Sequence, residues 1–219
     1  MFSLKRNDGF TLFEVIIAVA LVAIMAVAIV PPLLKNINEG KVARAQSDAQ
    51  VIATGILGFY KDTGDWPLDN NGNPGADLTR LASNAILGGG NAGIPAGAAG
   101  ISGGGNWDSY GTAGTLNDAL VRNATDTVDP IYTESKNPHI RPGWNGPYLD
   151  SVPLDPWGNP FVVNLRYTNT AVGNYERHAV LVVSAGPNQL FETTFDDGSY
   201  EEVIGGDDIG YLIRPAEQN

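Results

Sequence analysis

No cysteine occurs anywhere in this chain of 219 residues. Exported proteins often rely on disulfides, so an exported chain without them must hold its loops in another way. The absence of cysteine also excludes a thiol nucleophile, and only two histidines, His139 and His178, are available for acid–base chemistry. The sequence contains no recognisable serine elbow or phosphate-cradling loop. These absences predict that the protein is not an enzyme.

Basic residues are also scarce. Lys and Arg together number 13, against 24 Asp and Glu, which gives a formal net charge of −11 at pH 7. An acidic surface repels the phosphate backbone of nucleic acid and favours cations or basic partners. The composition therefore predicts that the protein has no nucleic-acid partner.

The longest apolar run covers residues 10–34 and follows a short leader, residues 1–9, that carries Lys5 and Arg6. A helix of ~25 residues is ~37 Å long, which is enough to cross a hydrocarbon core of roughly 30 Å. The two basic residues predict a cytoplasmic N-terminus, so the C-terminal part is expected to lie beyond the inner membrane. The alanines within the run also leave open an ordinary secretory signal with a small-residue cleavage site.

One carboxylate, Glu14, lies close to the start of the apolar run. A charged side chain at mid-membrane costs about 2.5–3.5 kcal/mol on insertion scales, and such a residue usually has a partner. The exposed N–H groups at a helix N-terminus favour a negative charge there. If the chain were cut after Gly9, the new ammonium group of Phe10 in a neighbouring copy would neutralise Glu14. Insertion into the membrane would then be coupled to assembly.

Residues 9–15, Gly-Phe-Thr-Leu-Phe-Glu-Val, resemble the processing site of the type IV prepilin family. The resemblance implies that a prepilin peptidase in the membrane cuts after Gly9 and methylates the new amine of Phe10. It also implies that Glu14, at the fifth position of the mature chain, guides the docking of subunits. The alternative interpretation is an ordinary signal anchor with one stray acid.

The helix is expected to continue past the membrane segment. Pro31 and Pro32 lack backbone N–H donors, so they predict a kink or local melting, and the resembling family has a proline at the position of Pro31. Residues 35–61 are expected to form an amphipathic helix that packs on the soluble domain. Its apolar stripe consists of Val42, Ala45, Ala49, Ile52, Ile56 and Phe59.

The soluble domain, residues 62–219, is long enough for one compact core. Its glycine-rich insertion, at about residues 69–143, carries few signals beyond a short helix expected at residues 116–123. Segments rich in Val and aromatic residues predict strands at residues 161–167 and 178–184, and a third near Tyr200–Ile204. The sequence predicts an α+β fold in which a long N-terminal helix packs on a small antiparallel sheet, as in pilins.

Two further strings resemble a narrower group. Residues 60–67, Tyr-Lys-Asp-Thr-Gly-Asp-Trp-Pro, and residues 154–161, Leu-Asp-Pro-Trp-Gly-Asn-Pro-Phe, are similar to signatures of the type II secretion major pseudopilins, the protein G-like group. The resemblance covers residues 1–67 and about 144–213. It implies nothing about the role of residues 84–114, where the glycines are densest.

The remaining chemistry lies in two C-terminal strings, residues 184–188 and 206–210. Asp207 and Asp208 are adjacent carboxylates, and a hard cation would relieve their mutual repulsion. Calcium takes six to eight oxygen ligands, and a calcium ion would also replace the missing disulfides as a link between loops. The alternative is a solvated acidic loop.

The resemblance extends to this loop, because the similar proteins bind calcium there. It implies that Ser184, Asp207 and Asp208 are ligands, with Ser184 contributing either its side chain or only its backbone oxygen. Asn188 stands where the family usually has Asp, which removes a charge but keeps a carbonyl oxygen. The longer loop in between offers further candidate ligands, among them Glu192, Asp196 and Asp197.

The resemblance implies a structural subunit that polymerises with itself into a type II secretion pseudopilus. The implied partners are the prepilin peptidase, an inner-membrane assembly platform and the minor pseudopilins. The subunit would begin as a single-pass inner-membrane protein with a periplasmic domain and end in a periplasm-spanning filament. Two alternatives stay open: a type IV pilin for adhesion or motility, and an unassembled membrane-anchored calcium-binding module.

Overall fold

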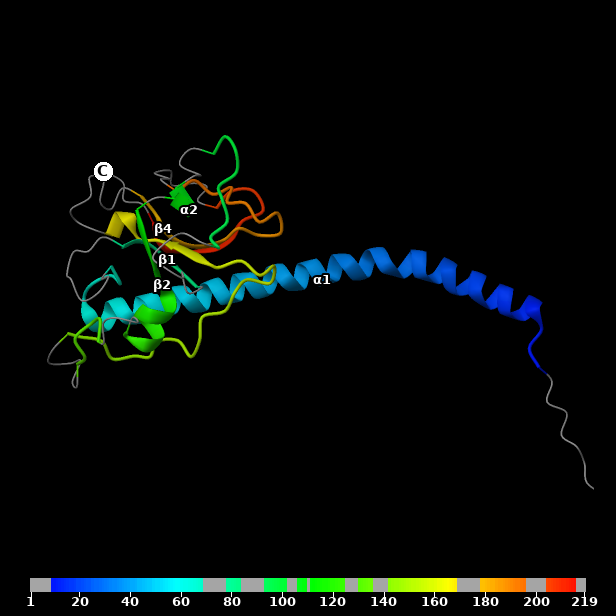
Figure 1. The fold of residues 1–219 in the computed structure, drawn as a ribbon, viewed down its shortest axis with the longest axis horizontal. Helices are drawn as coiled ribbons and strands as arrows, with labels where there is room; N and C mark the ends of the chain where they lie inside the picture. Colours follow the sequence, from blue (N-terminus) through cyan, green and yellow to red (C-terminus); the bar gives the residue numbers. More distant parts are fainter. Residues whose placement is uncertain are drawn as a thin grey trace, which may run out of the picture. The chain divides into compact units, whose positions relative to one another are not determined.

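A computed structural model describes residues 9–68, 78–83, 93–101, 106–109, 111–124, 130–135, 142–168, 178–195 and 204–215. The chain divides into two compact units, residues 1–41 and 42–219. Figure 1 shows the elements of both units, coloured along the sequence.

The first unit contains the start of the long helix α1, Leu12–Thr63. Every side chain of residues 10–40 is exposed, and by length and composition the helix can cross a membrane. The helical backbone continues through Pro31 and Pro32, so this structure shows no local melting there. A kink at the two prolines stays a prediction, because each lacks an N–H donor and its ring crowds the carbonyl of the preceding turn.

The second unit contains the rest of α1, which buries one face. The buried residues with side chains form one stripe with spacings of three and four, apart from the adjacent Ile52 and Ala53: Ala45, Ala49, Ile52, Ala53, Ile56 and Phe59. This spacing confirms that the amphipathic part packs on the soluble domain, although Val42 is 38% exposed. At the end of the helix Gly64 has a φ of 82°, and its N–H donates to the carbonyl of Tyr60 at 2.8 Å.

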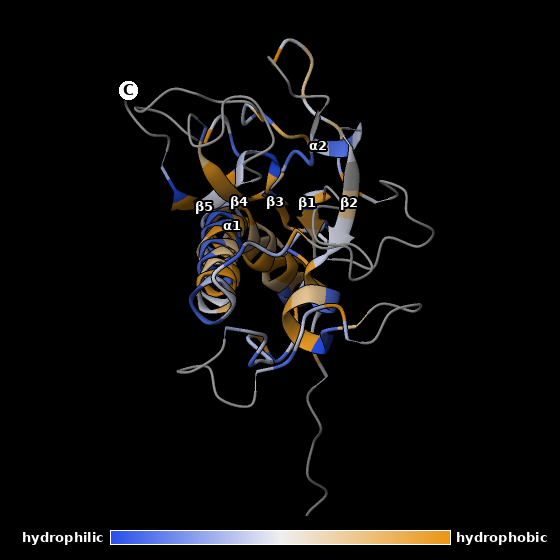
Figure 2. Cartoon of the chain, turned by 90° about the vertical axis from the view of Figure 1, so that its left-hand side faces the viewer, coloured by the Kyte–Doolittle hydropathy of each residue, from blue (hydrophilic) through white to orange (hydrophobic). Residues whose placement is uncertain are grey.

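The buried face of α1 packs on a five-stranded sheet with the strand order β2-β1-β3-β4-β5, seen side by side in Figure 2. The strands are β1 Leu78–Ala82, β2 Thr112–Thr115, β3 Val162–Asn164, β4 Val180–Ser184 and β5 Ile209–Arg214. Neighbouring strands are antiparallel except β1 and β2, which are parallel. The sheet is therefore mixed, not antiparallel as predicted, because the insertion contributes two strands joined by a long crossover.

The strand limits also differ from those predicted. β3 is short because the side-chain carbonyl of Asn164 accepts the N–H of Arg166 at 3.1 Å, and the chain then enters a short 3-10 helix, Arg166–Thr168. β4 lies within the predicted segment 178–184. Of the strand expected near Tyr200–Ile204, only Ile204 is among the described residues, and it is not in a strand.

The helix expected at residues 116–123 is present in part as a π-helix, Asp118–Arg122. It ends at Asn123, which adopts a left-handed conformation with a φ of 53°. The N–H of Asn123 donates back to the carbonyl of Asp118. The insertion thus contributes helical structure as well as strands to the soluble domain.

Both faces of the sheet are buried, because alternate residues of a strand point to opposite sides. The core that includes α1 contains Val163, Val180 and Val182. A second core contains Val162, Leu181 and Val183. The insertion completes this second core with Trp107, from the short helix α2, Asn106–Ser109, and the chain after β4 completes it with Phe191 and Phe195.

Candidate functional site

The first turn of α1 is capped by two of its own side chains. The backbone N–H and the hydroxyl of Thr11 both donate to Oε2 of Glu14, each at 2.9 Å. In return, the N–H of Glu14 donates to the Thr11 hydroxyl at 3.2 Å. This reciprocal pair is a capping box, and the pattern Thr-x-x-Glu at residues 11–14 is the sequence signal that predicts it. Glu14 therefore has a local partner within its own chain.

The residues around the expected cut are exposed. A Cβ atom added at Gly9 meets no atom within 4 Å, so nothing in the fold requires glycine there. Phe10 is 88% exposed and lines a shallow apolar depression along the helix together with Glu14, Ala18 and Val22. This end of the helix is therefore uncovered in the isolated chain.

The C-terminal carboxylates converge with Glu192; we call Glu192, Asp207 and Asp208 the acidic loop site. Oδ2 of Asp208 accepts the backbone N–H groups of Glu192 at 2.9 Å and Thr193 at 2.6 Å. Oε2 of Glu192 in turn accepts the N–H of Asp207 at 2.8 Å. The two loops that carry these acids are thereby joined, although they are more than a dozen residues apart in sequence.

Two glycines with positive φ make this approach possible. Gly186 has a φ of 61°, and a Cβ atom there would lie 2.2 Å from the carbonyl oxygen of Asp207. Gly206 has a φ of 59°, and a Cβ atom there would lie 1.8 Å from Oε2 of Glu192. Since both the conformation and the space exclude larger residues, glycine at these positions is a requirement of the acidic loop site.

The other two expected ligands, Ser184 and Asn188, make hydrogen bonds to residues distant in sequence. The hydroxyl of Ser184 donates to Oδ2 of Asp155 at 2.7 Å, which directs it to the Asp-Pro-Trp-Gly string. The backbone N–H of Asn188 donates to Oδ2 of Asp207 at 3.2 Å, while its side-chain oxygen accepts the N–H of Leu190 at 2.7 Å. Asp196 and Asp197 lie outside the described residues.

The environment shifts the acidity of all three carboxyl groups. Burial raises the pKa of Asp208 to about 6, against the opposing effect of its hydrogen bonds from Thr193 and Glu192. Burial is also the largest cause that raises the pKa of Asp207, and a hydrogen bond with Glu192 adds to it. For Glu192 the hydrogen bond from the Asp207 backbone lowers the pKa. Negative charge is thus costly at Asp207 and Asp208.

A cation would fit this chemistry. Within the described residues, the Oδ1 atoms of Asp207 and Asp208 are buried and accept no hydrogen bond. The same residues contain no group of three or more His, Cys, Asp and Glu side chains arranged to hold a metal. Because calcium also accepts backbone carbonyls and water, two orphaned carboxylate oxygens are compatible with a calcium ion that completes its shell in this way.

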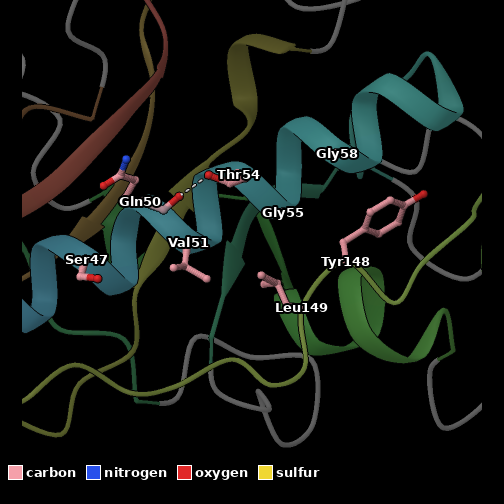
Figure 3. A pocket seen from close by; sticks show the side chains of 8 residues that line it. All are labelled: Ser47, Gln50, Val51, Thr54, Gly55, Gly58, Tyr148 and Leu149. Atoms are coloured by element: carbon pink, nitrogen blue, oxygen red, sulfur yellow. Dashed lines mark hydrogen bonds between the residues drawn. The ribbon is translucent and has the colours of Figure 1, made fainter.

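A separate groove of about 360 Å³ lies beside α1 in the second unit. Figure 3 shows Tyr148 and Leu149 facing the helix, where Gly55 and Gly58 leave room for them. A Cβ atom at Gly55 would lie 2.9 Å from the Leu149 side chain, and one at Gly58 would lie 3.3 Å from the Tyr148 ring. The glycines therefore allow the loop of Tyr148 to pack closely against α1.

An exposed apolar helix that runs on into a helix packed on a small sheet is the architecture of pilin-like proteins, so the predicted fold class is confirmed. Residues 4–30 match the prokaryotic N-terminal methylation motif, and residues 123–193 match the family of type II secretion system protein G.

Curated relatives agree with the family matches. The chain is 27% identical over 158 residues to the type II secretion system core protein G of Pseudomonas aeruginosa, and this region covers 72% of each chain. It is also 27% identical over 157 residues to the protein of the same name in Aeromonas hydrophila, again over 72% of each chain. No solved structure gives a comparable match. The resemblance is thereby confirmed: the chain is similar to type II secretion system protein G and matches the N-terminal methylation motif.

Proposed function

We propose that this chain is a major pseudopilin, a structural subunit of a type II secretion pseudopilus. It is cleaved after Gly9, methylated at Phe10 and polymerised to drive protein export across the outer membrane. The observation that carries the proposal is the apolar segment of α1, which has every side chain exposed and carries Glu14 in its first turn. An isolated chain has nothing but lipid to cover this surface, whereas a filament covers it with neighbouring helices.

The capping box supplies a mechanism for docking. Before assembly Glu14 is held by Thr11 of its own chain, which lowers the cost of placing a carboxylate near the membrane. During assembly the ammonium group of Phe10 in an adjacent copy pairs with the same carboxylate. The process requires the prepilin peptidase, an inner-membrane assembly platform and minor pseudopilins as partners. The role of the chain itself is structural, with no reaction to catalyse.

The acidic loop site is proposed to bind calcium. The orphaned Oδ1 atoms of Asp207 and Asp208, together with the raised pKa of both groups, support the proposal. A bound cation would offset the cost of two buried negative charges and would link the loop that follows β4 to the residues that precede β5. Other oxygen ligands would come from backbone carbonyls, water, or acids of the neighbouring loop.

The decisive experiment is mass spectrometry of the intact protein purified from its native membrane. The expected mass is that of a chain that begins at Phe10 and carries one methyl group. Gly9→Val should leave the precursor uncut, and Gly40→Val is the matched control, because an added Cβ atom meets no neighbour at either glycine. A wild-type protein that keeps its leader would contradict the proposal.

The same preparation separates the rival functions. A processed protein whose native filaments extend well beyond the cell would indicate a type IV pilin. An unprocessed protein that stays monomeric in detergent would indicate a membrane-anchored module. Short filaments that remain within the cell envelope are expected of a pseudopilin.

A further inference from the structure

The insertion contacts the chain segment that carries Glu192, one of the three residues of the acidic loop site. We call residues 191–195, which follow β4 and include Glu192, the bracing loop. The N–H of Phe191 donates to the carbonyl of Ala96 at 3.0 Å, and the N–H of Ala98 donates to the carbonyl of Phe191 at 2.7 Å. The insertion therefore holds the start of the bracing loop by two backbone hydrogen bonds, in a short parallel bridge between Gly97 and Phe191.

Trp107 holds the middle of the same loop. Its indole N–H donates to the carbonyl of Thr193 at 2.7 Å. Its ring stacks on Phe191 with centroids 4.8 Å apart and meets the edge of Phe195 at 5.0 Å. Trp107 is fully buried, and its own carbonyl accepts a hydrogen bond from the guanidinium of Arg80 in β1. A large rigid side chain from the insertion thus contacts three residues of the bracing loop.

The opposite side of the bracing loop contacts Asp208. Thr193 uses its carbonyl to accept from Trp107 and its N–H to donate to Oδ2 of Asp208. The neighbouring N–H of Glu192 donates to the same carboxylate oxygen, and the hydroxyl of Thr193 accepts the N–H of Gly205 at 3.2 Å. A single residue, Thr193, therefore lies between the indole of Trp107 and the carboxylate of Asp208.

We propose that Trp107 is a positioning residue for the acidic loop site. Through Thr193 it fixes the two N–H groups that orient Asp208, so the insertion provides the link between C-terminal loops that a chain without cysteine cannot make covalently. The consequence for calcium affinity rests on the proposed calcium function. The placement of Asp208 by the bracing loop does not depend on calcium binding.

The test uses the full chain in detergent micelles and two tryptophan variants. Trp107→Phe keeps an aromatic ring beside Phe191 and Phe195 but loses the donor to Thr193. Trp144→Phe is the matched control, because the indole N–H of Trp144 also donates to a backbone carbonyl, that of Ala119 at 3.0 Å, in the core that includes α1. Both variants lose one buried hydrogen bond and a similar volume.

The primary measurement is amide hydrogen exchange of residues 190–195 in the presence of a chelator. Trp107→Phe should speed exchange there about ten-fold, the effect expected of one lost buried hydrogen bond, and Trp144→Phe should leave it unchanged. Equal acceleration in both variants, or none in Trp107→Phe, would overturn the proposal. If Trp107→Phe does not fold, Ala98→Pro removes the donor to Phe191 and should have the same local effect.

The second measurement is a titration of the same proteins with calcium chloride. Trp107→Phe should weaken calcium binding about five-fold, while Trp144→Phe should bind as the wild type does. A wild-type protein that binds no calcium would end the calcium proposal, and hydrogen exchange alone would then decide the role of Trp107. Unchanged calcium affinity together with accelerated exchange would restrict that role to the loop and would refute its link to the metal.

Discussion

Asp155 and Ser184 are joined by a hydrogen bond of 2.7 Å between the serine hydroxyl and Oδ2 of the buried carboxylate. The other oxygen, Oδ1, accepts the backbone N–H groups of Trp157 at 3.0 Å and Asn159 at 2.7 Å. One side chain therefore shapes the Asp-Pro-Trp-Gly turn and ties it to the end of β4. This geometry gives the acid at the first position of that string a structural role.

We expect Asp155→Ala to destabilise the soluble domain by roughly 2–4 kcal/mol, because it leaves two backbone donors and one hydroxyl without their acceptor. For a chain of this size the melting temperature in detergent should fall by about 5–15 °C. Asp150→Ala is the control, since Asp150 is exposed. Equal melting temperatures for the two variants would show that the turn does not depend on the carboxylate.

The parts of the fold that the sequence predicts are those held by interactions between residues close together in the chain. The amphipathic part of α1 was predictable because Ala45, Ala49, Ile52, Ile56 and Phe59 lie at helical spacing within one segment. The capping box of Thr11 and Glu14 is equally local, since the Thr-x-x-Glu pattern alone indicates it. Local patterns thus contain enough information to place the helix and its first turn.

The sheet was less predictable because its pairing is not local. β1 pairs with β2 across about thirty residues of a glycine-rich insertion, which carries no periodic signal that announces a parallel neighbour. β5 is a half-exposed edge strand that contains Gly210, so its sequence shows no regular alternation of apolar and polar residues that would predict a strand. In the acidic loop site, the position of Asp208 depends on N–H groups of Glu192 and Thr193, which no spacing rule predicts.

The charge of Glu14 and its capping role can be separated experimentally. Glu14→Gln keeps a side-chain oxygen that accepts from Thr11, so the helix start and cleavage after Gly9 should be preserved. It removes the negative charge, so assembly into filaments should fall at least about ten-fold, the factor that corresponds to ~1.4 kcal/mol. Filament yield by electron microscopy and sedimentation measures the effect.

The control for this experiment is Glu39→Gln, which removes a carboxylate from the exposed pair with Lys35 on the same helix. That pair is solvent-exposed, so its loss should change stability little. Wild-type filament yield from Glu14→Gln would show that capping is the whole role of the residue. Failure of Glu14→Gln to be processed would place its role at an earlier step.

The glycines of α1 should differ in their response to alanine. Alanine is favoured over glycine by up to about 1 kcal/mol within a helix, so Gly40→Ala should be neutral or stabilising, since its Cβ atom meets nothing within 4 Å. At Gly55 the new Cβ atom would lie 2.9 Å from Leu149, and overpacking of this kind costs about 1–3 kcal/mol. Gly58→Ala should fall between them, because the Tyr148 ring is 3.3 Å away. The melting temperature should therefore be highest for Gly40→Ala, intermediate for Gly58→Ala and lowest for Gly55→Ala. Any other order would contradict the close packing of the groove.

Calcium should raise the stability of the full chain in detergent. If the acidic loop site binds the ion, a free concentration of about 100 times the dissociation constant adds roughly 2.7 kcal/mol, and a chelator reverses the gain. Asp208→Asn should abolish the difference in stability between the protein with calcium and the protein with chelator. The variant should still fold in chelator, because the amide oxygen still accepts hydrogen bonds from Glu192 and Thr193 and the side chain no longer carries a charge that burial opposes. Asp150→Asn, at an exposed position, should respond to calcium as the wild type does. A melting temperature that is the same with calcium and with chelator, or an equal calcium response in Asp208→Asn, would show that these acids hold no ion and that hydrogen bonds alone join their loops.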